Sequence, residues 1–186
     1  PSTESIVYHQ MYGFGRNDYM KIGLVSSTIP EAGINEGTAC VALPHRVALR
    51  CKIKADGNRS SQPQGIFDIA ASVDHSAALV RRASGAVALY TWGNASHGAL
   101  GLPHPIVGLD LRDDVNSEVQ AVPVPTLVAA ISCSSNPAAR SVSLLLDDEG
   151  EYPVGLSLGQ RSSFVVTSIG RFFSFGMSEE GMLGLG

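Results

Sequence analysis

The chain has 186 residues, of which 44% are hydrophobic and 16% are charged, and its formal net charge is -4. This composition fits one folded domain, or a part of one, and excludes a chain that is mainly disordered. It gives no electrostatic indication of a nucleic-acid-binding surface, and the apolar runs are too short to span a membrane.

Glycine and proline are abundant, with 20 and 10 residues. This load argues against a helical bundle and favours many short strands joined by tight turns. The three cysteines are too few, and odd in number, for a disulfide framework, and no CxxC pair indicates a zinc site. We therefore expect reduced, buried thiols, and neither a metal site nor a cofactor.

The first predicted element lies at residues 9–24, where Met11–Leu24 reads MYGFGRNDYMKIGL. Its large residues at alternate positions predict a strand with one tightly packed face. Gly15 ends this strand, and variable polar residues form the loop that follows. Ile22 returns to the core, and Gly23 allows a second tight bend.

The same fourteen-residue pattern recurs without gaps at Leu89–Leu102 and Phe172–Leu185. A column of three glycines arises by chance about once in a thousand, and the pattern has two such columns. We therefore expect a structural repeat. Its shared residues are Phe14, Gly15, Ile22, Gly23, Trp92, Gly93, Gly98, Leu100, Gly101, Phe175, Gly176, Gly181, Leu183 and Gly184.

A strand, a polar turn and a second strand are predicted before two of the copies, so the longer repeat units cover residues 66–102 and 154–186. The best copy resembles the repeat of the regulator-of-chromosome-condensation family. The residues that carry this resemblance are Ala70, Ala71, Ser72, His75, Ser76, Ala78, Leu79, Tyr90, Trp92, Gly93, Gly98, Leu100 and Gly101. In the last copy Ser162 replaces the histidine and Phe175 the tryptophan.

The resemblance implies an all-β fold, a β-propeller of four-stranded blades. Successive motifs start 78 and 83 residues apart, counted at Phe14, Trp92 and Phe175, whereas a blade needs about 40–50 residues. We therefore expect an incomplete ring of about three to four blades, with long inserted loops around 25–65 and 103–130. Residues 129–152 are a candidate decayed blade, and sequence missing from the numbering is the alternative. The rest of the ring would come from missing sequence or from another chain.

Several residues are candidates for chemistry or binding. His75 has a family core position, so a packed, hydrogen-bonded role is expected for it rather than catalysis. Ser84, in the sequence RRAS, resembles a kinase site, although a solvated hairpin tip is the simpler interpretation. Candidates for a partner surface are Arg81, Arg82, Asn94, His97, Asp113 and Asp114.

These observations favour a non-catalytic interaction or scaffold propeller that binds protein partners, and the sequence offers no catalytic constellation. The alternative is a guanine-nucleotide exchange factor for a Ran-like small GTPase, which is the activity of the founding family member. A chromatin-associated or ubiquitin-ligase-associated propeller is a third hypothesis. An intracellular location, in the cytoplasm, the nucleus or an organelle, is expected in each case.

Overall fold

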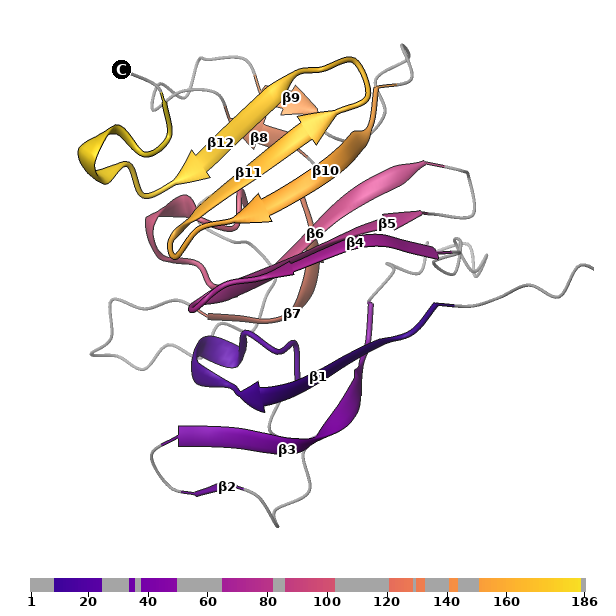
Figure 1. Cartoon of the computed structure of the whole chain (residues 1–186), viewed down its shortest axis with the longest axis vertical. Coiled ribbons are helices and arrows are strands. Elements are labelled where there is room, and N and C mark those ends of the chain that lie inside the picture. Colours follow the sequence, from indigo (N-terminus) through magenta and orange to yellow (C-terminus); the bar gives the residue numbers. More distant parts are fainter. Residues whose placement is uncertain are drawn as a thin grey trace, which may run out of the picture.

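The computed structural model describes residues 9–24, 34–35, 38–49, 65–81, 86–102, 121–128, 130–132, 141–143 and 151–184. The regular elements in these ranges are β-strands and short 3₁₀ turns (Figure 1), which confirms the predicted all-β class. No helix among the described residues is long and apolar enough to cross a membrane.

The central sheet is a complete four-stranded antiparallel blade. Its strands follow the chain order: β4 (Gly65–Ala71), β5 (His75–Arg81), β6 (Val87–Asn94) and β7 (Ala121–Leu127). Every residue of β6 is buried, because neighbouring sheets cover both faces of this strand.

One further sheet lies on each side of the central sheet (Figure 1). The first sheet contains β1 (Met11–Arg16), β3 (Thr38–Val47) and the two-residue β2 (Ile34–Asn35), in the order β1-β3-β2. The last sheet is the antiparallel meander of β10 (Pro153–Leu158), β11 (Ser162–Thr167) and β12 (Phe172–Gly176). A two-stranded sheet joins β8 (Ala130–Ser132) to β9 (Ser141–Ser143).

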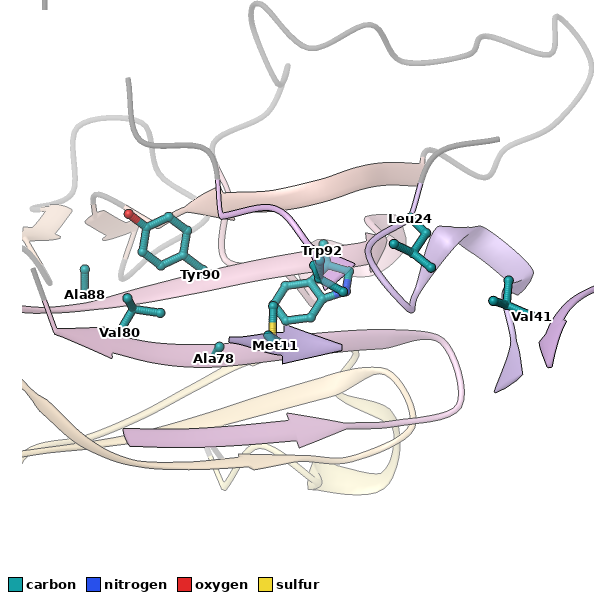
Figure 2. Packing of buried hydrophobic residues seen from close by; sticks show 9 residues of the cluster. Met11, Leu24, Val41, Ala78, Val80, Ala88, Tyr90 and Trp92 are labelled. Carbon is teal, nitrogen blue, oxygen red and sulfur yellow. The ribbon is translucent and has the colours of Figure 1, made fainter. Parts of the chain in front are cut away.

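Side-chain alternation along β6 builds two hydrophobic cores. Tyr90 and Trp92 point towards the first sheet, where they pack with Met11 and Leu24 (Figure 2). Leu89, which directly precedes Tyr90, points the other way and packs against the last sheet with Phe175. The period of two in a strand therefore assigns each residue of the motif to one of two junctions between blades.

Each motif ends in the same short turn: η1 (Asp18–Met20), η4 (Ser96–Gly98) and η5 (Glu179–Gly181). The middle residue of each turn, at the ninth column of the pattern, has a positive φ of 55°, 61° or 53°. The glycines of the fifth and thirteenth columns also have positive φ in all three copies. The backbone thus repeats as regularly as the sequence does.

The ranges expected to be insertions also contain outer strands. β3 lies within 25–65 and pairs with β1, and β7 lies within 103–130 and pairs with β6. Prolines hide β7 from a sequence-based search, since Pro123 and Pro125 lie inside it. An edge strand tolerates proline because only one of its sides is paired. Within 129–152, the range of the candidate decayed blade, the described residues form β8, β9 and the segment that leads into β10.

Candidate functional site

In the first two motifs, the glycine of the thirteenth column lies against an aromatic side chain of the next blade. A Cβ atom on Gly23 would lie 3.0 Å from Nε1 of Trp92, and one on Gly101 would lie 2.9 Å from the ring of Phe175. Contacts this short leave no room for a side chain. The glycine of the thirteenth column is therefore needed for packing between blades as well as for its positive φ.

A serine–carbonyl hydrogen bond repeats at the same two junctions. Ser76 Oγ donates to the carbonyl oxygen of Lys21 over 2.7 Å, and Ser163 Oγ donates to that of Ala99 over 2.7 Å. Lys21 and Ala99 share the eleventh column of the pattern, and the two serines share a position in the preceding strand. Both serines are buried, so each bond gives a buried hydroxyl group the partner that it needs.

His75 adds to the second junction a hydrogen-bonded chain that the first lacks among the described residues. Its Nε2 lies 2.9 Å from Ser163 Oγ, and its Nδ1 lies 2.9 Å from Ser72 Oγ. Because Ser163 gives its proton to Ala99, Nε2 of His75 is the donor in its hydrogen bond with Ser163. This chain of hydrogen bonds links the central and last sheets.

Burial lowers the pKa of His75 from 6.5 to about 4, although the nearby Asp74 carboxylate and a hydrogen bond with the backbone of Gln160 act in the opposite direction. The ring is fully buried and therefore neutral at neutral pH. Asp74 also pairs with Arg161 of the next blade, with 3.5 Å between Oδ2 and Nε. Both ring nitrogens of His75 lie within hydrogen-bond distance of serines, Ser72 in the central sheet and Ser163 in the last sheet.

Hydrogen bonds inside each motif hold its turn in place. Thr91 Oγ1 donates to the carbonyl of Leu100, and Ser174 Oγ donates to that of Leu183, each over 2.8 Å. The first copy has Gly13 in this column, where a Cβ atom would lie 2.4 Å from the carbonyl oxygen of Ile22. The three turns are therefore braced at the same point, by a hydroxyl group in two copies and by close backbone approach in the first.

The braced turns expose one side chain each at their ninth column: Tyr19, His97 and Glu180. We call these three residues the turn tips. The three turns lie at the same end of the three sheets, on the left in Figure 1. Sequence reasoning selected only His97 of this set, although reading down the ninth column would have found the other two.

The partner-surface candidates from the sequence fall into three groups. Arg81 is exposed, and its guanidinium lies 4.4 Å from the ring centre of Phe67. Asn94 is only 7% exposed, and its side-chain oxygen accepts a hydrogen bond from the backbone of Ser96. His97 is the exposed turn tip of the central sheet. The other partner-surface candidates, Arg82, Asp113 and Asp114, lie outside the described residues, as does the kinase-site candidate Ser84.

The sequence led us to expect buried thiols and no metal site. Cys40 is exposed, so the burial expected of it is wrong. Among the described residues, no three His, Cys, Asp or Glu side chains come together as metal ligands would.

Comparison with known proteins gives a structural match without a sequence match. No family model matches the chain, and no curated protein sequence does. Yeast RCC1 (Prp20), solved bound to Kap60, superposes with a TM-score of 0.59 and 23% identity, over 95% of this chain and 30% of that one. The structure of Prp20p from Saccharomyces cerevisiae, studied for its binding to Gsp1p and histones, matches with a TM-score of 0.59 and 24% identity, over 96% of this chain and 31% of that one. The chain therefore has the fold of a partial regulator-of-chromosome-condensation propeller, and it spans about 30% of the length of these solved structures.

Proposed function

We propose that this chain is a protein-binding segment of a propeller that performs no chemistry of its own, and that its partners contact the turn tips. The observation that carries the proposal is the contrast within each turn. The braced backbone is the same in the three copies, whereas the exposed ninth-column residue is an aromatic, a histidine and a glutamate. A rigid scaffold that displays variable side chains is the usual design of a binding surface.

The same proposal is supported by the hydroxyl groups and the imidazole of the repeat core, because these groups have structural partners within the fold. His75, Ser72 and Ser163 bond to one another and to the carbonyl of Ala99, which occupies them in holding blades together. Within the part of the chain that the structure describes, no hydrogen bond or ion pair ties the side chain of a turn tip to the fold. Glu179, next to the tip Glu180, is also exposed, so the turn of the last sheet is acidic and suits a basic partner.

The test compares three forms of the tagged chain in pull-down experiments with quantitative mass spectrometry. The tip variant carries Tyr19→Asn, His97→Asn and Glu180→Asn, because asparagine tolerates the positive φ at these positions. The control carries Leu43→Ser, a change at a 70% exposed residue outside the turns. We expect the control to keep the partners and the tip variant to lose them. Partners retained by a folded tip variant would contradict the proposal.

Nucleotide exchange on a Ran-like GTPase is a second candidate function, and the fold likeness to Prp20p supports it. Prp20p has been studied for binding to Gsp1p, and this chain matches about a third of that structure. The assay is the release of a fluorescent GDP analogue from Ran and from Gsp1p. Release at the intrinsic rate would support the non-catalytic proposal, whereas acceleration that the tip variant abolishes would establish exchange at the same surface. Adding histones to the pull-down tests the chromatin-associated hypothesis.

A further inference from the structure

Arg161, in the turn before β11, connects the last sheet to the central sheet through its guanidinium group. Nε lies 3.5 Å from Oδ2 of Asp74 in the central sheet, and Nη1 donates a hydrogen bond to Sδ of Met177 over 3.8 Å. The two backbones are also bonded, because the N–H group of Met177 donates to the carbonyl oxygen of Arg161 over 2.9 Å. Met177 therefore helps to hold the guanidinium in the position from which it reaches Asp74.

The contact with Met177 is the weaker of the two that the guanidinium makes. A thioether sulfur accepts hydrogen bonds poorly, whereas a carboxylate accepts them well. The side chain of Asp74 is only 10% exposed, so its charge depends on this partner, whereas that of Arg161 is 45% exposed and can turn towards water. A stronger acceptor at position 177 would keep Arg161 on Asp74.

Oxidation of the sulfur supplies such an acceptor without a change in the backbone. A sulfoxide carries a polar oxygen atom where the thioether has a lone pair. The sulfur–oxygen bond is less than half as long as the 3.8 Å between Sδ and Nη1, so the new oxygen comes within hydrogen-bond distance of Nη1. Nε is a separate donor of the same rigid fork and stays on Asp74. One guanidinium thus serves both acceptors at once.

The four methionines of the chain differ in how well an oxidant can reach them, and all four lie among the described residues. Met11 is 5% exposed in the first core, and Met182 is 51% exposed in the last turn. Met20 and Met177 are half-buried. Because exposure governs oxidation, Met177 is within reach of a small oxidant, whereas Met11 is protected and serves as an internal reference.

We propose that Met177 is a site of reversible oxidation by peroxides, and that its sulfoxide fastens Arg161 to Asp74 and so strengthens the junction between the central and last sheets. In this step a lone pair of the sulfur forms the new S–O bond, and the O–O bond of hydrogen peroxide breaks. The leaving oxygen takes the proton of the oxygen that stays on sulfur and departs as water. The sulfur is oxidised and the peroxide is reduced. A thiol-dependent sulfoxide reductase restores the thioether.

The test uses the full chain carrying Met20→Leu and Met182→Leu, so that Met177 is the one methionine outside the core. The chain is treated with hydrogen peroxide, and peptide mass spectrometry follows each remaining methionine. We expect Met177 to be oxidised well before Met11 while the chain is folded. Urea denaturation should then give an unfolding equilibrium constant about fivefold lower for the oxidised chain, the effect of a partly exposed hydrogen bond to a charged group. Treatment with the reductase should reverse this gain.

Three variants in the same background separate the proposed bond from other effects of the oxidant. Met177→Leu cannot form a sulfoxide, so it corrects for oxidation of the cysteines. Arg161→Gln keeps the sulfur but removes the guanidinium, so oxidation should no longer stabilise the chain. Met177→Gln needs no oxidant, because its amide oxygen has a similar reach. We expect Met177→Gln to be more stable than Met177→Leu, and this difference to disappear when Arg161→Gln is added.

Three results would overturn the proposal. Oxidation of Met177 no faster than that of Met11 would show that peroxide does not reach the site. An oxidised chain that is no more stable than the reduced chain would show that the sulfoxide does not fasten Arg161. Equal stabilisation in the Arg161→Gln chain would mean that the effect arises elsewhere.

Discussion

The central sheet and the two outer sheets carry the same motif but bury it differently. Trp92 of the central sheet is 2% exposed, whereas Phe14, in the same column of the first sheet, is 62% exposed. On the opposite face of the motif, Leu89 is fully buried and its counterpart Phe172 in the last sheet is 60% exposed. The motif therefore specifies which way each side chain points, and the neighbouring blades decide whether that side chain is covered.

The largest difference should appear between Trp92→Ala and Phe14→Ala. Removing a buried aromatic side chain lowers the free energy of unfolding by about 3–5 kcal/mol, whereas truncating a mostly exposed one costs about 0.5 kcal/mol. Urea denaturation of the two variants measures both values. Equal losses would mean that Phe14 is covered in solution and that this face of the first sheet is not exposed.

The next effect is a dependence of stability on pH that comes from the second junction. The pKa of His75 is about 4 in the folded chain and near 6.5 when unfolded, so the unfolded state binds more protons between these values. Stability should therefore fall as the pH drops from about 6.5 to 4, by up to about 3 kcal/mol for this group.

The control for this prediction is His75→Gln, whose amide can still donate to Ser163 but does not titrate. Carboxylates also titrate in part of this range, so the informative quantity is the difference between the wild-type and variant unfolding free energies. This difference should change with pH, and a constant difference from pH 7 to 4 would contradict the lowered pKa of His75.

The hydrogen bonds of Ser163 and Ser76 should make the stabilities of the two junctions differ by a smaller amount. Ser163→Ala removes the acceptor of His75 and the donor to Ala99, so it leaves two buried groups unpaired. Ser76→Ala removes only the donor to Lys21. We expect losses of about 2–3 and about 1 kcal/mol, measured by urea denaturation. A larger loss for Ser76→Ala would show that the first junction is the stronger one.

Much of the fold follows from the sequence, because the repeat is local. The glycines, aromatic residues and hydroxyl groups of a motif act within fourteen residues or against the next copy, so alignment of the copies finds them. The hydrogen bond between His75 and Ser163 joins residues 88 positions apart, and no local pattern predicts it. Nor could the motif show that Phe14 is exposed and Trp92 buried, because this depends on which blades are adjacent.

The sequence pattern does not reveal the outer strands β3 and β7, for a different reason. β3 and β7 contribute few core side chains, so their sequences carry little of the period-two signal that marks the inner strands. Pro44 in β3 falls where its register with β1 shifts, and Pro125 in β7 lies on an outer strand. Proline is tolerated at both kinds of position, although it counts against a strand when only the sequence is read.

The smallest effect is expected at the turn tips, where the three sheets are alike. His97 has a φ of 61° and is exposed, so His97→Gly relieves the strain of a left-handed residue and loses no packing. The gain is offset by the greater freedom of glycine in the unfolded chain, so the unfolding free energy should change by less than about 0.5 kcal/mol.

Urea denaturation of His97→Gly beside the wild type measures this change. Gly101→Ala is the contrasting variant, because a Cβ atom there meets the ring of Phe175 at 2.9 Å. A substantial loss for His97→Gly would mean that the tip supports the blade. A neutral result would show that residues can vary at the tips without cost to the propeller, as a binding surface on a fixed scaffold requires.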